Sequence, residues 1–306
     1  MALPKYADPL ERAWHYIYLV ICALIFLFLI APILVVIPLS FNAEPYFTFT
    51  EKMLKLDSEG YSTRWYDLLL TFGMQEPDAV RDSSWWSDVW HNAQWVQATK
   101  NSVIIGFFST ILATTLGTIA ALGLSRPEMP ARRTIMAILI SPMIVPIIIT
   151  ATGLFFFYSW IGIQNWGIPY LGVVLAHATL GIPFVIITVT ATLVGFDHSL
   201  TRAAANMGAD PMRTFFKVQM PLILPGVISG ALFAFVTSFD EVVVVLFVGG
   251  LDEQTIPRQM WNGIREQISP AILSVATILV IISIALLATV ELLRRRSERL
   301  RGVTPR

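Results

Sequence analysis

The sequence predicts an all-α integral membrane protein with six transmembrane helices, and three observations support this fold class. The 306 residues are 55% hydrophobic and only 14% charged, whereas a soluble domain carries about 25% charged residues. The mean hydropathy is +0.67. Six stretches are also long enough to cross the ~30 Å hydrocarbon core, which takes about 20 apolar helical residues. Together these observations exclude an ordinary soluble enzyme, a disulfide scaffold and a disordered regulator.

The six stretches define a single transmembrane domain over residues 1–306. Each stretch is apolar all round and not striped, which is typical of membrane spans. We expect the first to be a retained span because it is too long for a signal peptide and has no small-residue cleavage site after it. The predicted spans are residues 16–39, 99–124, 134–160, 170–194, 223–247 and 270–293, with an outer loop at 40–98 and a cytoplasmic loop at 195–222.

The distribution of basic residues predicts how these spans are oriented. Loops on the cytoplasmic side of a membrane carry an excess of Lys and Arg. The two ends of the chain and the segments 125–133 and 195–222 are basic, whereas the loop at 40–98 is acidic. We therefore expect both termini in the cytoplasm. That side then holds 14 of the 21 basic residues: Lys5, Arg12, Arg126, Arg132, Arg133, Arg202, Arg213, Lys217, Arg294, Arg295, Arg296, Arg299, Arg301 and Arg306.

The loop at 195–222 has helical features of its own. Ser199 or Thr201 is a suitable N-cap for a short helix, and Gly208 is a suitable stop. Asp210 followed by Pro211 is typical of the N-cap and first residue of a second helix. The segment therefore predicts two short cytoplasmic helices, after which Pro221 and Pro225 should interrupt the chain as it re-enters the membrane.

The second of these helices presents an apolar surface. Met212, Phe215 and Phe216 are spaced i, i+3 and i+4, so they share one helix face. An exposed apolar patch in a cytoplasmic loop usually marks a protein contact. The alternative is an interfacial helix that lies on lipid headgroups.

The loop resembles the cytoplasmic signature of bacterial ABC-importer permeases, E-A-A-x3-G-x9-I-x-L-P. It departs from that pattern at Arg202, which replaces the glutamate, while Val218 and Met220 are conservative changes. The resemblance implies a type I ABC-importer permease fold in which this loop forms coupling helices that dock on an ATPase subunit. It implies close helix packing at Ala203, Ala204 and Gly208, a docking face at Met212, Phe215 and Phe216, and a coupling role for Arg202 and Pro221.

The similarity extends over nearly the whole chain, and residues 101–126 resemble the opening permease span of these importers. Residues 230–249, followed by Thr255-Ile256-Pro257, are similar to the spermidine/putrescine branch in particular, whereas residues 74–94 read as an insertion. This resemblance implies the import of polyamines or similar cationic organic solutes. Permeases for ferric iron, phosphonate, thiamine and oligosaccharides share much of the pattern and are the alternatives.

The partners follow from what the chain lacks. A P-loop requires Gly before its lysine, and none of the five lysines is preceded by glycine. The chain is therefore expected to be no enzyme, with no catalytic residue and no bound cofactor, and to leave ATP and Mg to a separate ATPase dimer. The family resemblance further implies a second, different permease chain, an external solute-binding protein and a bacterial inner membrane. No nucleic-acid partner is expected from a neutral chain.

Two other classes of protein are less well supported by the sequence. A self-sufficient secondary transporter or channel commonly contains internal repeats, and none is evident. An intramembrane enzyme needs a nucleophile with a base, or a metal cluster. Cys22 has no histidine near it in the sequence, and the four scattered histidines predict no metal site. We expect His177 to be a hydrogen-bonded packing residue.

Asp240 and Glu241 are the acidic pair within a predicted span. A carboxylate at the bilayer centre costs about 2.5–3.5 kcal/mol, so such residues face a partner, a cavity or a pathway. Adjacent helical residues point ~100° apart, so we hypothesise that one acid lines the pathway near its outer mouth and the other anchors the helix. The candidate pathway residues are Ser238, Phe239, Asp240 and Glu241. The alternative is a structural role, as caps or as partners of Arg258 or Arg265.

Tryptophan is concentrated in the outer loop, at Trp85, Trp86, Trp90 and Trp95. Because tryptophan favours the membrane interface, the preferred interpretation is a helix at the level of the outer headgroups. The alternative is a docking surface for the binding protein, formed by Trp85, Trp86 and Trp90.

Overall fold

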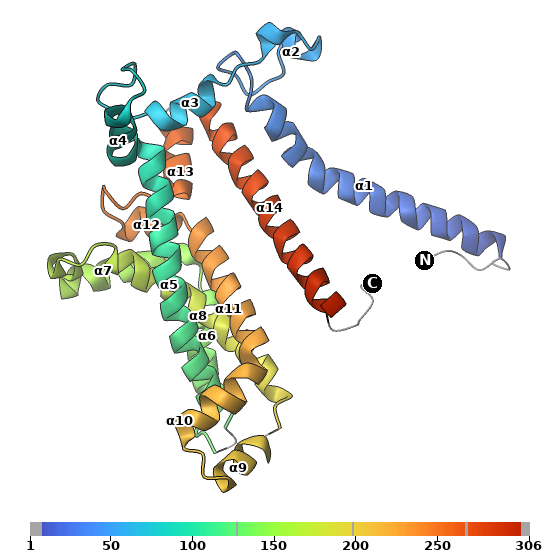
Figure 1. Ribbon diagram of the computed structural model, residues 1–306, viewed down its shortest axis with the longest axis vertical. Helices are drawn as coiled ribbons and strands as arrows, with labels where there is room; N and C mark the ends of the chain where they lie inside the picture. Colours follow the sequence, from blue (N-terminus) through green and yellow to red (C-terminus); the bar gives the residue numbers. More distant parts are fainter. Residues whose placement is uncertain (1–7, 127, 198, 267–268, 301–306) are drawn as a thin grey trace. The chain divides into compact units, whose positions relative to one another are not determined.

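The protein is helical in the computed structural model, which describes residues 8–126, 128–197, 199–266 and 269–300 (Figure 1). Across these ranges there is no strand, and Asn42 and Tyr61 form one isolated bridge. The chain divides into two compact units, Met1–Gly73 with Gly263–Arg306, and Met74–Asn262. Of the basic residues used for the orientation, Lys5, Arg301 and Arg306 lie outside the described residues, and so do the side chains of Arg294, Arg295, Arg296 and Arg299.

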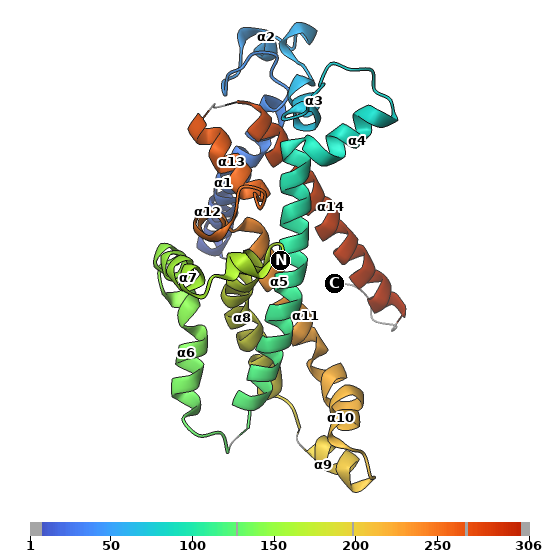
Figure 2. The ribbon, with the colours of Figure 1, turned by 90° about the vertical axis from the view of Figure 1, so that its left-hand side faces the viewer.

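Three long helices form the core of the unit Met74–Asn262. They are α5 (Gln94–Leu124), α8 (Leu171–Val194) and α11 (Met220–Asp240), and Figure 2 shows them side by side. Their shared core consists mainly of small and β-branched residues: Ala113, Ala121, Ala178, Val185, Val189, Leu193, Ile223, Val227 and Ala234. Small residues let transmembrane helices approach closely, and this is how the three helices pack.

Glycines at the contact between α8 and α11 show how close the approach is. A Cβ atom on Gly230 would lie 2.8 Å from the Cα of Val185, and one on Gly181 would lie 2.9 Å from the Cβ of Ala234. Carbon atoms pack best at about 3.5–4.0 Å. No larger residue fits at either position without moving a helix.

The third predicted span is not one straight helix. It consists of α6 (Arg132–Ile144) and α7 (Ile147–Ile161), which are bent by 102° at the break. Pro146 fixes its own φ at −53° and holds the preceding Val145 extended, at φ −69° and ψ 135°. The prediction of a continuous helix over residues 134–160 was therefore wrong, although the proline that breaks it was visible in the sequence.

The fifth predicted span differs at both ends. At its C-terminal end α11 stops at Asp240, Glu241 is extended, and a short helix α12 (Val243–Val248) follows. At its N-terminal end the helix begins earlier, because α10 (Pro211–Thr214) continues through a π-helical turn η3 (Phe215–Gln219) into α11. Residues 211–240 form one apolar helix of 30 residues.

Neither Pro221 nor Pro225 interrupts this helix, contrary to the prediction. Proline lacks the N–H that would bond to the carbonyl four residues earlier, and its ring clashes with that carbonyl. The π-helical turn just before Pro221 widens the backbone at this place. The widening explains how the helix continues past the first proline.

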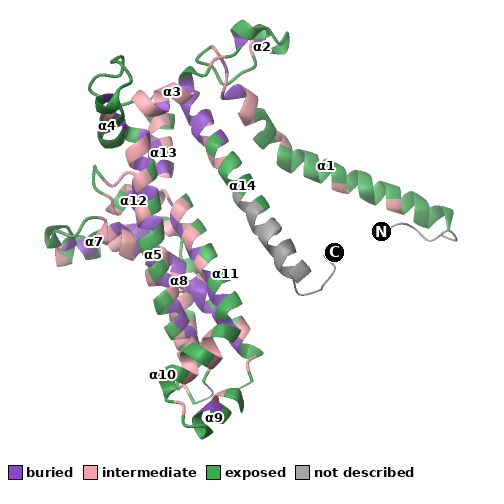
Figure 3. Ribbon diagram, in the orientation of Figure 1, coloured by how far each residue is buried: buried purple, intermediate pink, exposed green. Residues whose placement is uncertain are grey.

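The second unit is built from the two ends of the chain. It contains α1 (Pro9–Leu39), α2 (Glu51–Leu54), the 3-10 turn η1 (Ser58–Gly60), α3 (Arg64–Thr71) and α14 (Ala271–Leu300). Side-chain hydrogen bonds hold its polar end together: Trp65 Nε1 donates to the carbonyl of Asn42 at 2.7 Å, and Ser274 Oγ donates to that of Ser40 at 3.3 Å. Figure 3 shows α1 exposed along most of its length.

Four helices among the described residues are long and apolar enough to cross a membrane, and the bent pair α6–α7 brings the number to five if it is one span. They are α1, α5, α8 and the helix over residues 211–240. The start of α14 matches the sixth predicted span, and its apolar part runs over Ala271–Ala285. The total of six spans therefore stays a prediction. The remaining helices are α4 (Ser83–Asn92), η2 (Ile163–Trp166), α9 (Ser199–Asn206) and α13 (Ile256–Glu266).

Candidate coupling loop and substrate surface

The first helix of the loop at residues 195–222 is α9. It begins at Ser199, whose backbone N–H and hydroxyl both donate to Asp197, at 2.8 Å and 2.7 Å. It ends where Gly208 adopts φ +85° and the N–H of Ala209 donates to the carbonyl of Ala204. Gly is the usual residue at such a left-handed C-cap. The predicted stop at Gly208 is confirmed, and Asp197 takes the capping role that the sequence offered to Ser199 or Thr201.

The second helix of the loop begins as the sequence predicts. Asp210 is the N-cap and accepts a hydrogen bond from the N–H of Arg213 at 2.8 Å, and Pro211 is the first residue of α10. The guanidinium of Arg213 also lies 3.4 Å from the Asp210 carboxylate. These local contacts fix the direction in which the long helix leaves the loop.

The predicted docking face is only partly exposed. Met212 and Phe216 are 66% and 58% exposed, one helical turn apart. Phe215 is half-buried, and its ring lies edge-to-face on that of Phe216 with centroids 4.9 Å apart. Met212 and Phe216 therefore form the accessible apolar surface, and the half-buried ring of Phe215 packs against that of Phe216.

The other signature residues are not all packed within this chain. Ala204 is buried, whereas Arg202, Ala203, Gly208 and Pro221 are exposed. A Cβ atom on Gly208 would contact nothing within 4 Å, so its glycine identity serves the backbone conformation. Figures 1 and 2 both show α9 and α10 at the opposite end of α5 from α4. The loop is thus separated from the tryptophan-rich segment by the full length of a membrane-spanning helix.

Ser238, a predicted pathway residue, lies inside the helix bundle. Its hydroxyl is 2.8 Å from Nδ1 of His177 on α8 and 2.9 Å from the hydroxyl of Ser109 on α5. All three side chains are buried. Ser238 therefore joins three helices, and His177 is the hydrogen-bonded packing residue that the sequence predicted.

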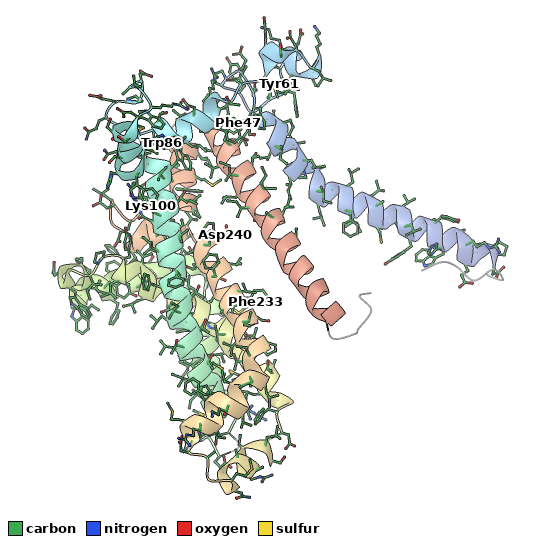
Figure 4. The ribbon with its side chains drawn as sticks, viewed as in Figure 1. Phe47, Tyr61, Trp86, Lys100, Phe233 and Asp240 are labelled. Atoms are coloured by element: carbon green, nitrogen blue, oxygen red, sulfur yellow. The ribbon has the colours of Figure 1, made fainter. Side chains whose placement is uncertain are left out.

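Asp240 and Glu241 have opposite environments. Asp240 is exposed at the end of α11, one side of which also carries the exposed Phe233 and Val236 (Figure 4). Glu241 is only 8% exposed, and its carboxylate accepts a hydrogen bond from the N–H of Val244 at 3.0 Å. A carboxylate at this position caps the first turn of a helix. Glu241 thus anchors α12, and Asp240 is the acid left free to face a pathway.

The neighbours of this pair are also defined. Phe239 is half-buried and stacks on Phe235, with ring centroids 5.7 Å apart. Arg258, one of the alternative partners for the acids, donates from Nη1 to the carbonyls of Val245, Gly249 and Gly250. Arg258 therefore holds the turn after α12 and is occupied with backbone oxygens.

The tryptophan-rich segment forms α4. Trp85 is 2% exposed and donates to the carbonyl of Pro77, so only Trp86 and Trp90 present large apolar surfaces (Figure 4). The hydroxyl of Ser84 donates to the helix N-cap Asp82 and lowers the pKa of its carboxyl. The Nζ of Lys100 lies 4.4 Å from the ring centroid of Trp90. This segment folds against the start of α5 through its own contacts.

The sequence did not indicate the role of the segment after α12. Asn101 at the start of α5 donates to the carbonyls of Asp252 and Gln254, at 2.7 Å and 2.9 Å. The polar residues in this short outer segment gave no periodic signal. Among the described residues no three His, Cys, Asp or Glu side chains are grouped closely enough to hold a metal ion.

The long apolar helices are those of a protein that crosses a membrane several times. Residues 113–301 match the family described as "Binding-protein-dependent transport system inner membrane component", and the chain belongs to this family. It is therefore an inner-membrane protein that crosses the membrane several times, and its family is one of transport subunits and not of catalytic ones.

Individual relatives cover almost the whole chain. It is 29% identical to the spermidine/putrescine transport system permease protein PotC of Haemophilus influenzae, over 90% of this chain and 95% of that protein. It is 31% identical to the putrescine transport system permease protein PotI of Escherichia coli K12, over 85% and 84%. PotC of the same strain is 28% identical, over 89% and 91%.

The fold is shared with a solved transporter. The crystal structure of a bacterial ABC transporter involved in the import of the acidic polysaccharide alginate matches with a TM-score of 0.62. The match covers 95% of this chain and 99% of the other, at 14% sequence identity. The expected ABC-importer permease fold is thereby confirmed.

Proposed function

We propose that this chain is the membrane-spanning subunit of an ATP-driven importer for polyamines such as putrescine and spermidine. The relatives that cover most of its length carry these substrates in their names. The chain also has an acid of its own on the exposed face of α11, at Asp240. A carboxylate replaces part of the hydration shell that a protonated amine loses on entering the pathway.

The proposed coupling mechanism rests on one observation, the continuous helix that runs from the coupling loop to Asp240. Its 30 residues span about 45 Å at 1.5 Å per residue. Met212 and Phe216 lie at one end and Asp240 at the other, so a displacement of the docking face moves the acid as well. The pathway then alternates between its two openings as nucleotide binding shifts the populations of the two states.

In this proposal, other chains supply the remaining subunits of the transporter. An ATPase dimer with ATP and Mg docks on Met212 and Phe216, and Arg202 takes the place of the signature glutamate at that contact. A second permease chain of different sequence completes the pathway, and an external solute-binding protein delivers the solute. Both termini lie in the cytoplasm, and no cofactor or metal is bound by this chain.

The surface beside Asp240 suits an organic cation. Phe233 stacks on Phe184 of α8 with centroids 6.0 Å apart and an interplanar angle of 19°. Aromatic faces attract ammonium groups and also tolerate the methylene segments between them. A small anion such as phosphonate gains nothing from this combination of an acid and aromatic rings.

Uptake and co-purification measured together test the proposal. We expect cells that lack other polyamine carriers to take up radiolabelled putrescine when they express the full transporter. Phe216→Asp should abolish co-purification of the ATPase subunit, because it places a charge in the docking face. Leu54→Asp is the matched control, since Leu54 is also an exposed apolar residue, at 70% against 58% for Phe216, but lies in the predicted outer loop. Asp240→Asn should leave co-purification of the ATPase subunit unchanged. It should lower uptake about tenfold, because one charge-assisted contact to the solute is lost.

Two results would contradict the proposal in different ways. Transport of ferric iron, phosphonate, thiamine or an oligosaccharide with no uptake of putrescine or spermidine would remove the substrate class. Flux through the purified chain without an ATPase subunit would instead favour a self-sufficient transporter or channel.

A further inference from the structure

A cavity of about 720 Å³ lies within the unit Met74–Asn262, apart from Asp240 and from the coupling loop. Small-molecule sites usually measure about 300–1,000 Å³. Its walls are the end of α7, the segment that leads into α8, and the segment that follows α12. Both of these segments belong to the loops that the charge distribution predicts on the outer side. The lining side chains that matter here are Phe155, Tyr158, Phe247, Asp252 and Glu253.

The carboxylate of Glu253 binds backbone groups of both loop walls of the cavity. Glu253 accepts from the N–H of Tyr170 at 2.8 Å and from that of Gly250 at 2.9 Å. Tyr170 is a non-glycine residue at φ +61°, a strained conformation that persists only where surrounding contacts enforce it. Its hydroxyl donates to Oδ1 of Asn101 at 2.9 Å. The contact between the walls is therefore built in and does not depend on a ligand.

A second set of contacts fixes the acidic wall. The side-chain amide of Asn101 donates to the carbonyls on either side of Glu253, those of Asp252 and Gln254. On the other side of the turn, Arg258 donates to the carbonyls of Gly249 and Gly250. Asp252 is exposed and is one of the residues that line the cavity.

The lining indicates which ligand the cavity takes. Asp252 and Glu253 are acidic, and the residues that line the cavity include no Lys, Arg or His. Phe155, Tyr158 and Phe247 add aromatic rings, which attract ammonium groups through their faces. Tyr158 is 7% exposed and lines the cavity. A tyrosine hydroxyl both donates and accepts hydrogen bonds, so it suits a ligand that carries an amine.

We propose that this cavity is an outer binding site for a protonated aliphatic amine, separate from the pathway acid Asp240. Asp252 pairs with an ammonium group, Tyr158 offers its hydroxyl, and the aromatic rings cover the methylene chain. The proposal rests on the proposed function for its ligand class, since the cavity then holds the imported solute before it reaches Asp240. Glu253 is a positioning residue, because its oxygens are used by the backbone of the two walls.

Equilibrium binding of radiolabelled putrescine to the complete transporter in lipid nanodiscs tests this site. The binding protein is omitted, and Asp240→Asn is the background so that the pathway acid does not contribute. We expect Asp252→Asn to weaken binding about tenfold and Tyr158→Phe about threefold, as for lost charged and neutral hydrogen bonds. Asp252→Glu should restore most of the affinity. Asp78→Asn, which removes an exposed acid elsewhere in the same unit, is the matched control.

The outcomes separate this proposal from the proposed function. If the transporter takes up putrescine but Asp252→Asn and Tyr158→Phe bind it as the background does, the cavity site is overturned and the function stands. If putrescine binds in a manner sensitive to Asp252 while no polyamine is taken up, the site stands and the assigned transport substrate fails. Absence of putrescine binding in the Asp240→Asn background overturns the site directly.

Discussion

Asp240 and Glu241 are neighbours in the sequence with different tasks in the structure. The carboxylate of Glu241 is buried against the first turn of α12, whereas that of Asp240 is exposed. The difference arises because α11 ends between them, so their directions are not those of adjacent helical residues. The sequence predicted that the two acids differ, and the helix break decides which of them is the anchor.

Ser238 is the residue on which the polar contact between three helices depends. Within the described residues, its hydroxyl is the partner of the buried Nδ1 of His177, whereas Nε2 of the same ring has no partner. Ser238→Ala therefore leaves a fully unpaired imidazole in the bundle. We expect a loss of about 1–3 kcal/mol in the free energy of unfolding, the cost of a buried unsatisfied group.

Thermal unfolding of the purified transporter measures this loss. Ser229→Ala is the control, since Ser229 is exposed on the same helix. If both variants unfold at the same temperature as the wild-type protein, the contact between Ser238 and His177 contributes nothing to the packing of α5, α8 and α11.

At the scale of elements, the breaks in the helices matter more than their lengths. Pro146 marks the break between α6 and α7 in the sequence. The hydropathy pattern does not show this break, because a single proline leaves the apolar run continuous. The break after α11 has no such signal, since the residues from Val242 onward continue as a β-branched apolar run. Only the capping contact of Glu241 with Val244 marks it.

The contact between α8 and α11 depends on glycine. A Cβ atom at position 230 would lie 2.5 Å from the hydroxyl of Thr188 and 2.8 Å from the Cα of Val185. Since the second atom belongs to the backbone, α11 has to move away from α8. We expect Gly230→Ala to destabilise the protein by about 1–3 kcal/mol, as overpacking of a core does.

The matched substitution is Gly153→Ala in α7, where a Cβ atom would meet nothing within 4 Å. There alanine should be neutral or stabilising by up to about 1 kcal/mol through its helix propensity. Thermal unfolding of both variants compares them. Equal stability of the two would show that α8 and α11 do not pack as closely as the structure has them.

At the scale of the whole molecule, the formal net charge of zero is the sum of basic and acidic segments that alternate along the chain. The predicted cytoplasmic segments are basic and the predicted outer loops are acidic. From this pattern the positive-inside rule predicts that both termini lie in the cytoplasm. Within the unit Met74–Asn262, α4 and α9 lie at opposite ends of α5 (Figure 2), as this orientation requires.

Cysteine labelling tests the orientation, because Cys22 is the only cysteine in the sequence. In a Cys22→Ser background, Ser87→Cys on α4 should react with a membrane-impermeant maleimide in intact spheroplasts. Asn206→Cys on α9 should react only after the membrane is permeabilised. Both positions are exposed, so access is decided by the side of the membrane. The reverse pattern of labelling would place the termini and the coupling loop outside.

The membrane class, most of the apolar helices, the two helices of the loop at residues 195–222 and the family could be predicted from the sequence alone. This was possible because these features are local: an apolar run predicts a span, and Gly208, Asp210 and Pro211 specify caps through their own backbone preferences. The tertiary structure decided what depends on contacts between distant segments. It placed Ser238 within hydrogen-bonding distance of His177 and Ser109, and it brought Tyr158 and Asp252 to one cavity. Each of these depends on the distance between helices that are far apart in the sequence, and no local pattern contains that distance.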